Sequence, residues 1–204
     1  MTALEIDTPH GPARAHLEPV EGATAALVLG HGAGGGVAAP DLRAAARAAR
    51  SAGVSVALVE QPYRVAGRRS PAPARQLDAA WSAVAEQLRA GPLHGLALIT
   101  GGRSSGARVA CRTAQDAGAA GVLCLAFPLR PPRRAERPPA DSRLPELDAA
   151  GVPVLVVQGA RDPFGVPPAG PGRTVVEVAG DHSLRSDAGA VEAAVRDWLT
   201  ALVG

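Results

Sequence analysis

The feature that most constrains the fold is a repeated alternation of short apolar segments with amphipathic ones. The apolar segments are continuous rather than alternating, as in strands buried on both faces; they span residues 25–29, 54–59, 96–100, 122–127, 154–157 and 174–178. Patterns with helical spacing separate most of them, at residues 41–52, 73–89, 106–117 and 187–203. This order predicts an α/β fold with a mostly parallel, twisted sheet of seven or eight strands and helices on both faces.

The remaining segments complete this prediction. Residues 1–20 read as two short strands around a turn at 8–12, which contains Pro and Gly. Residues 129–142 and 163–172 are too rich in Pro to form regular helices. No linker divides the chain, so we expect one domain over residues 1–204 with little or no lid. The helical spacing predicts two buried faces: Leu77, Ala80, Trp81, Val84 and Leu88 in one helix, and Val191, Val195, Trp198 and Leu202 in the last.

Composition argues against several classes of function. The formal net charge is only +2, and aromatic residues make up 2% of the chain, so neither a basic footprint nor stacking platforms for nucleic acid are expected. No apolar run reaches the length of a membrane helix, and the first residues lack a secretory pattern, so we expect a cytoplasmic protein without membrane association. The two cysteines, Cys111 and Cys124, are expected to be buried structural thiols rather than metal ligands.

The segment Gly102-Arg103-Ser104-Ser105-Gly106 lies between a predicted strand and a predicted helix. In that context G-x-S-x-G forms a sharp turn that raises the serine hydroxyl above the sheet, and the tight backbone requires glycine on both sides. The following helix N-terminus favours negative charge developing in front of it. Ser104 is therefore the candidate nucleophile; the alternative is a simple helix N-cap.

A nucleophilic serine needs a base, and the base needs an orienting acid. His182 follows the last predicted strand, and Asp162 follows the preceding one, so the chain order is Ser, Asp, His. Because the carboxyl ends of parallel strands share one edge of a sheet, we expect these side chains to converge. The alternative role for Asp162 is a turn cap, and Asp181 is its rival as the acid; we rank Asp181 lower because a residue adjacent to His182 points away from it in extended backbone.

A second glycine-rich loop, residues 30–36, follows an earlier strand. Such a loop turns backbone N–H groups toward an oxyanion, and we pair the N–H of Ala33 with that of Ser105. His31 is expected to hold this loop by a hydrogen bond rather than to act as a second base. His31, Tyr63, Arg64 and Arg103 are also weaker candidates for binding substrate, the last three through a substrate carboxylate; structural or solvated roles are favoured over binding for these residues.

These motifs together resemble the α/β-hydrolase superfamily. The His31-to-Gly34 loop, the elbow at Ser104, the turn at Asp162 and the turn at His182 are similar to those of its small, lidless, dienelactone-hydrolase-like branch, and Gln61-Pro62-Tyr63-Arg64 resembles a loop of that branch. The resemblance implies a serine hydrolase with Ser104 as nucleophile, His182 as base and Asp162 as acid. Ser105 and Ala107 stand where that branch carries Met and Gly; both are small, so the elbow is expected to survive.

The sequence thus predicts hydrolysis of a carboxylic ester or thioester on a small acyl substrate through an acyl-enzyme, without metal or cofactor. One alternative is a non-catalytic binding module that keeps the fold. A less favoured one is a dinucleotide-binding protein, because residues 30–35 also fit G-x-G-x-x-G and Glu60 ends the next strand. The sequence indicates neither the substrate nor the oligomeric state. The run of Arg130, Arg133, Arg134 and Arg137 is expected to be a hydrated loop, with an acidic partner as the alternative.

Overall fold

A computed structural model describes residues 2–131 and 141–204. In these residues one eight-stranded sheet carries six helices. The strands are β1 (Thr2–Ile6), β2 (Ala13–Glu18), β3 (Ala25–Gly30), β4 (Ser55–Glu60), β5 (Ala97–Arg103), β6 (Gly121–Leu125), β7 (Val154–Gly159) and β8 (Arg173–Val178). The helices are α1 (Pro40–Ser51), α2 (Pro62–Val65), α3 (Ala74–Ala90), α4 (Ser105–Thr113), α5 (Leu144–Asp148) and α6 (Ala188–Val203).

The sheet has the strand order β1-β2-β4-β3-β5-β6-β7-β8. β1 and β2 form an antiparallel hairpin and β2 pairs antiparallel with β4, while the six strands β3 to β8 are parallel to one another. The predicted mostly parallel sheet is therefore confirmed. Because β3, β5, β7 and β8 run in the same direction, the loops after their carboxyl ends emerge at one edge.

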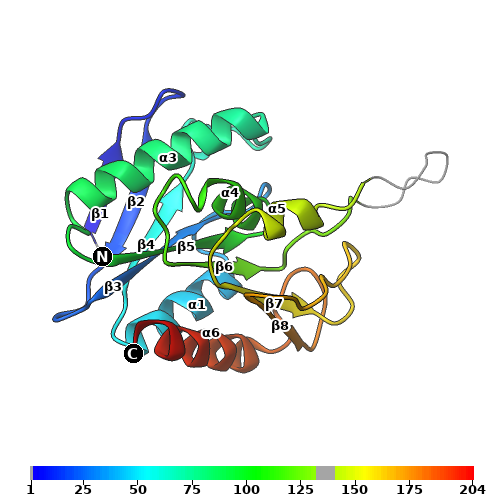
Figure 1. Cartoon of the computed structure of the whole chain (residues 1–204). Coiled ribbons are helices and arrows are strands. Elements are labelled where there is room, and N and C mark those ends of the chain that lie inside the picture. Colours follow the sequence, from blue (N-terminus) through cyan, green and yellow to red (C-terminus); the bar gives the residue numbers. More distant parts are fainter. Residues whose placement is uncertain (1, 132–140) are drawn as a thin grey trace.

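Helices cover both faces of the sheet (Figure 1). α1 and α6 pack side by side on one face, and α3, α4 and α5 lie on the other. Successive residues of a strand serve opposite faces: Leu27 and Leu29 join the core under α1 and α6, whereas Ala26 and Val28 join the core under α3. Because helices cover both faces of the sheet, side chains on both faces are buried, and these strands are therefore continuously apolar.

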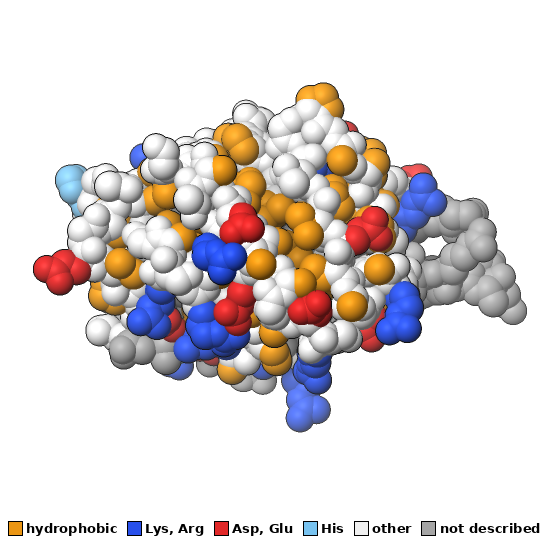
Figure 2. All heavy atoms as spheres, turned by 90° about the horizontal axis from the view of Figure 1, so that it is seen from below, with side chains coloured by type: hydrophobic (Ala, Val, Ile, Leu, Met, Phe, Trp, Pro, Cys, Tyr) orange, Lys and Arg blue, Asp and Glu red, His pale blue; other side chains and the backbone are white. Residues whose placement is uncertain are grey.

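The face that carries α1 and α6 shows how the outer surface is kept polar. Figure 2 views the molecule from below, and acidic and basic side chains interleave there with small hydrophobic areas. An ion pair between Arg47 of α1 and Glu192 of α6 joins the two helices. Val191, Val195 and Leu199 are the buried residues of α6, whereas Trp198 and Leu202, which the sequence placed on that face, are only partly buried.

The main elements lie where the sequence predicts them, and Trp81 is in the core as expected, with 1% of its surface exposed. Two short helices were missed: α2, in a segment predicted as loop, and α5. Each has Pro in its first turn, which suits helix initiation, but four or five residues are too few to show periodicity. β5 continues past residue 100 through Gly101 and Gly102, which the sequence assigned to the following turn. α4 ends at Thr113, earlier than predicted.

The two cysteines are buried, as the sequence predicts, with their sulfur atoms 3.4 Å apart. Burial raises the pKa of the Cys124 thiol well above its ordinary value, so it stays protonated. None of the described helices combines the length and apolarity that crossing a bilayer requires. Residues 163–172 contain no helix, as predicted, whereas Arg133, Arg134 and Arg137 lie outside the described residues.

Candidate active site

Ser104 occupies a sharp turn between β5 and α4. Its backbone has φ +52° and ψ −108°, a conformation that residues with a side chain rarely adopt. As the residue before α4 it could cap the helix, but its side chain makes no capping hydrogen bond. The hydroxyl instead lies 3.0 Å from Nε2 of His182. The turn therefore aims the hydroxyl at the imidazole rather than at the helix.

The two glycines of this turn are required by close backbone contacts. A Cβ on Gly102 or on Gly106 would lie 2.6 Å from the carbonyl oxygen of Gly30, which is closer than real Cβ atoms come. β3 and the start of α4 thus meet without room for a methyl group. Ala107, which departs from the family pattern, is fully buried, and Ser105 begins α4, so neither residue disturbs the turn.

His182 and Asp162 continue the hydrogen-bonded chain from Ser104. Nδ1 of His182 lies 2.8 Å from Oδ2 of Asp162, whose side chain is fully buried. Because an ionised carboxylate only accepts, the neutral imidazole carries its proton on Nδ1 and leaves Nε2 free to accept the Ser104 O–H. The three side chains predicted from the sequence therefore lie in contact. Asp181 does not reach the imidazole; its carboxylate accepts hydrogen bonds from Ser183.

The loop after β3 passes close to Ser104. A Cβ on Gly32 would lie 3.6 Å from Cβ of Ser104. Ser105 is the first residue of α4, so its N–H precedes the intrahelical hydrogen bonds, and the Ala33 N–H meets no backbone acceptor within the described ranges. Both amides thus belong to segments that border the nucleophile, and both lack a competing backbone partner.

His31 and Tyr63 fasten this loop. His31 is 2% exposed; its Nδ1 donates to the Gly32 carbonyl at 2.9 Å, and its Nε2 accepts the N–H of Gln61 at 3.1 Å. Burial lowers the pKa of His31 from its ordinary value, so the ring stays neutral. The Tyr63 hydroxyl donates to the Ala33 carbonyl at 3.2 Å. The structure thus gives His31 the expected holding role and gives Tyr63 a similar one.

A sequence profile described as an alpha/beta hydrolase domain matches residues 23–188. The chain belongs to the alpha/beta hydrolase family. No curated protein matches the sequence significantly.

Solved structures with the same fold include small hydrolases. This alpha/beta hydrolase is 23% identical to XC6422 from Xanthomonas campestris, described as an α/β serine hydrolase without a lid, over 97% of this chain and 94% of that chain, with a TM-score of 0.71. For Est1E from Butyrivibrio proteoclasticus the identity is 14%, the coverage 100% and 99%, and the TM-score 0.77. A dienelactone hydrolase from Anabaena variabilis is 16% identical, over 98% of this chain and 95% of that chain, with a TM-score of 0.72. At these identities the likeness shows the fold, and it confirms the α/β-hydrolase fold that the sequence predicts.

One polar residue of the hydrolase site escaped the sequence analysis. Gln158 is fully buried in β7, and its Nε2 lies 2.8 Å from Oδ2 of Asp162, 2.9 Å from the carbonyl of Gly165 and 3.1 Å from that of Phe127. Three surrounding acceptors identify that atom as the nitrogen. Asp162 Oδ1 also accepts the N–H of Phe164 at 2.9 Å. The only sequence signal for Gln158 was a polar residue at the end of an apolar strand.

Arg103 and Arg64, the other candidate substrate-binding residues, have different surroundings. The guanidinium of Arg103 contacts Asp41 and the carbonyl of His182, so it is engaged within the protein. Arg64 is partly exposed, and its guanidinium lies 3.4 Å from the carbonyl of Arg68. The structure therefore brings Arg103, but not Arg64, into contact with a residue of the Ser104–His182–Asp162 chain.

The glycine loop of the hydrolase lacks the features that dinucleotide binding requires. α1 begins at Pro40, several residues after the last glycine, so no helix N-terminus faces the loop at Gly35. Oε2 of Glu60 lies 3.8 Å from Arg14 and 3.5 Å from His16, so its carboxylate already has partners within the protein.

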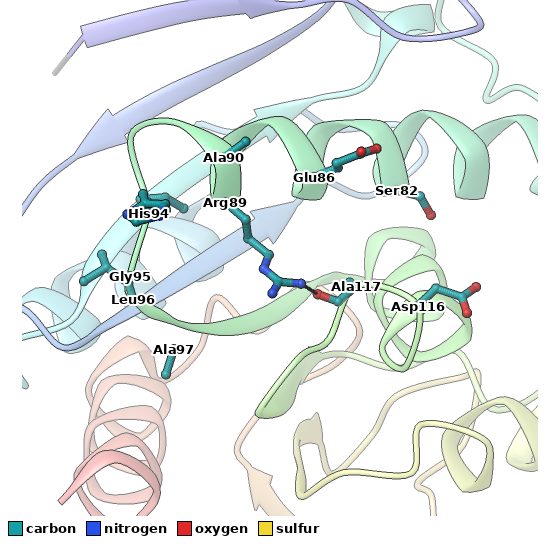
Figure 3. A pocket seen from close by; sticks show the side chains of 11 residues that line it. Ser82, Glu86, Arg89, Ala90, His94, Gly95, Leu96, Ala97, Asp116 and Ala117 are labelled. Atoms are coloured by element: carbon teal, nitrogen blue, oxygen red, sulfur yellow. Dashed lines mark hydrogen bonds between the residues drawn. The ribbon is translucent and has the colours of Figure 1, made fainter.

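One surface hollow of the hydrolase lies away from Ser104. It has a volume of about 830 Å³ and is lined by the end of α3, the loop that leads to β5 and the residues after α4, including Arg89, His94, Ala97 and Asp116. In Figure 3 the Arg89 side chain points to Ala117, whose carbonyl it meets at 2.8 Å. Since Ala97 begins β5 and Ser104 follows its end, the hollow and the nucleophile are roughly 20 Å apart. This hollow therefore lies outside the active site.

Proposed function

We propose that this alpha/beta hydrolase cleaves a carboxylic ester or thioester of a small acyl substrate through a covalent acyl-enzyme. One observation carries the proposal: the Ser104 hydroxyl is 3.0 Å from His182 Nε2, and His182 Nδ1 is 2.8 Å from a buried Asp162 carboxylate. A hydroxyl, an imidazole and a carboxylate in this order are the parts that nucleophilic acyl transfer needs.

In the proposed reaction His182 takes the proton of Ser104 as the hydroxyl oxygen attacks the substrate carbonyl. Asp162 keeps the proton on Nδ1 and stabilises the imidazolium that forms. His182 then protonates the departing alcohol or thiol, and in the second half of the cycle it activates the water that releases the acid. The steps use side chains of this chain and water.

The negative charge on the tetrahedral intermediate needs hydrogen-bond donors. We assign this role to the N–H groups of Ala33 and Ser105, because both border Ser104 and lack competing backbone acceptors within residues 2–131 and 141–204. Each such donor lowers the barrier by about 3 kcal/mol when it is already aimed at the developing charge. His31 and Tyr63 contribute indirectly, because they fix the loop that presents Ala33.

A fluorophosphonate probe tests the nucleophile. We expect the wild-type protein to be labelled and Ser104→Ala to be unlabelled, with p-nitrophenyl acetate hydrolysis lost in parallel. Ser51→Ala is the control, because this serine only donates to the Ala48 carbonyl in α1. A folded wild-type protein that is neither labelled nor active would overturn the proposal and favour the non-catalytic binding module.

The acid is tested by a matched pair of substitutions. Asp162→Asn is expected to reduce kcat by about four orders of magnitude, because an amide stabilises the wrong imidazole tautomer. Asp181→Asn, one residue from His182, is expected to leave kcat within about threefold, because the Asp181 carboxylate accepts hydrogen bonds from Ser183 rather than from His182. Equal losses in both variants would contradict the assignment. p-Nitrophenyl esters and thioesters of graded chain length then define the substrate class.

A further inference from the structure

Arg103 contacts Asp41, His182 and Gly32, and the proposed mechanism uses none of these contacts. It is the last residue of β5, directly before Ser104, and its side chain is 19% exposed. Its Nε lies 2.7 Å from Oδ2 of Asp41 in α1. Its second terminal nitrogen donates to the carbonyl of His182 at 3.0 Å. A Cβ on Gly32 would lie 2.9 Å from its first terminal nitrogen, so the guanidinium also lies against the glycine loop.

Asp41 is the anchor of this arrangement. Its side chain is fully buried, and burial raises its pKa, while the neighbouring Arg103 opposes that rise and favours the carboxylate. Oδ1 of Asp41 accepts the N–H of Leu42 at 2.9 Å, which orients the carboxylate. A buried carboxylate needs hydrogen-bond donors or a neighbouring cation; Leu42 N–H donates to Asp41 and Arg103 is the cation in contact with it, so Asp41 and Arg103 hold each other in place.

The contact with the His182 carbonyl matters because His182 lies in a loop. Asp162 holds the ring at Nδ1, but the position of Nε2 also depends on where the main chain lies. Arg103 supplies that second point of attachment, from the residue adjacent to the nucleophile. An arginine suits the task because its planar fork reaches the Asp41 carboxylate and the His182 carbonyl at once, whereas a lysine ammonium is a single point of charge.

We propose that Arg103, anchored by Asp41, is a positioning residue that holds the main chain of His182 so that its imidazole meets the Ser104 hydroxyl. The inference rests on the proposed function, because it assigns Arg103 a part in activating that nucleophile. It also explains why the residue before the nucleophile is a long, partly buried cation, which a turn by itself does not require.

The test compares kcat and KM for p-nitrophenyl acetate, and the rate of fluorophosphonate labelling, in three variants. We expect Arg103→Met to lower kcat and the labelling rate by about 50-fold with KM within about threefold, because small misplacements of a catalytic group cost up to about 100-fold. Arg103→Lys should recover part of the loss, and Asp41→Asn should lose about tenfold because the guanidinium is no longer anchored. Arg89→Met is the control, since Arg89 also donates to a backbone carbonyl, at the distant hollow.

Two results would overturn the inference. A folded Arg103→Met protein with wild-type kcat and labelling rate would show that His182 needs no such support. A rise in KM with unchanged kcat would show that Arg103 binds substrate instead. If Arg103→Met does not fold, Arg103→Lys and Asp41→Asn decide by the same two criteria. The first step is to show that the wild-type protein is labelled and that Ser104→Ala is not. If the wild-type protein is not labelled, the proposed function itself is overturned. If it is labelled and the Arg103 variants are labelled at the same rate, only the positioning role is overturned.

Discussion

The elbow at residues 102–106 and the loop at residues 30–36 both contain glycines and both lie beside Ser104, but different kinds of contact hold them in place. In the elbow, Gly102 and Gly106 are wedged against the Gly30 carbonyl, where an added Cβ would lie 2.6 Å away. In the loop after β3, Gly34, Gly35 and Gly36 have no atom within 4 Å of an added Cβ. The elbow is therefore fixed by backbone packing, whereas the loop is held by side chains, chiefly His31 and Tyr63.

The two turns differ in how accurately each must hold its geometry. A nucleophile must hold its geometry to a few tenths of an ångström, and packed backbone provides that. An oxyanion loop needs only to present an N–H, so a few hydrogen bonds suffice and its tip stays open. Substitutions in the two turns should accordingly differ in both size and kind of effect.

The largest effect is expected for Gly106→Ala. The new methyl group would meet the Gly30 and His31 carbonyls at 2.6 and 2.8 Å, so β3 and α4 must move apart. We expect a loss of about 1–3 kcal/mol of stability and at least about 100-fold in the rate of Ser104 labelling. Urea unfolding measures the stability, and the kinetics of fluorophosphonate labelling measure the reactivity of Ser104. Labelling of the folded variant at the wild-type rate would refute the idea that the packed elbow sets the nucleophile.

A second effect, on stability and its pH dependence, is expected for His31→Phe. Because burial lowers the pKa of His31 in the fold, the unfolded chain takes up this proton first as the pH falls below the ordinary value of 6.5. The contribution of His31 to stability is thus complete above pH 6.5 and is lost as the pH falls toward the folded-state pKa. His31→Phe should lack this loss and should cost about 1–3 kcal/mol at pH 7.5, since Gln61 N–H loses its buried acceptor.

Urea unfolding at pH 7.5, 6.5 and 5.5 measures both quantities. The difference in unfolding free energy between wild type and His31→Phe should shrink as the pH falls. A difference that stays constant over this range would show that His31 is not the group responsible.

A smaller effect is expected for Tyr63→Phe, which removes only the hydrogen bond to the Ala33 carbonyl. The ring stays buried, so stability should fall by about 0.5–1.5 kcal/mol. Because the loop also keeps its His31 contacts, kcat should fall by less than about tenfold with little change in KM. A loss as large as that of Gly106→Ala would mean that the loop is as tightly constrained as the elbow.

The smallest effect is expected for Gly35→Ala. An added methyl group meets nothing within 4 Å, and the backbone is outside the left-handed region that favours glycine. Because alanine restricts the unfolded chain, the variant should be as stable as wild type or up to about 1 kcal/mol more stable. Its melting temperature and kcat are compared with those of wild type; a clear loss of either would show that the open loop needs its flexibility.

Much of this architecture was predictable because its signals are local. The continuously apolar strands specify a sheet buried on both faces, and G-x-S-x-G between a strand and a helix marks Ser104 within five residues. His182 and Asp162 followed from strand order, since parallel strands end at one edge. The helices α2 and α5 were missed because they are much shorter than the window of roughly 11–18 residues over which helical periodicity is detected.

What the sequence alone determined is the layered fold, the elbow and the short list of chemically able residues. Periodicity, glycine spacing and chain order are properties of neighbouring positions, so they can be read without coordinates. Only the tertiary structure decided which distant groups touch: that Gln158 donates to Asp162, that Tyr63 holds Ala33, and that Arg103 reaches from Asp41 to the carbonyl of His182. Those contacts depend on how helices and loops pack over the sheet, and no local pattern encodes that packing.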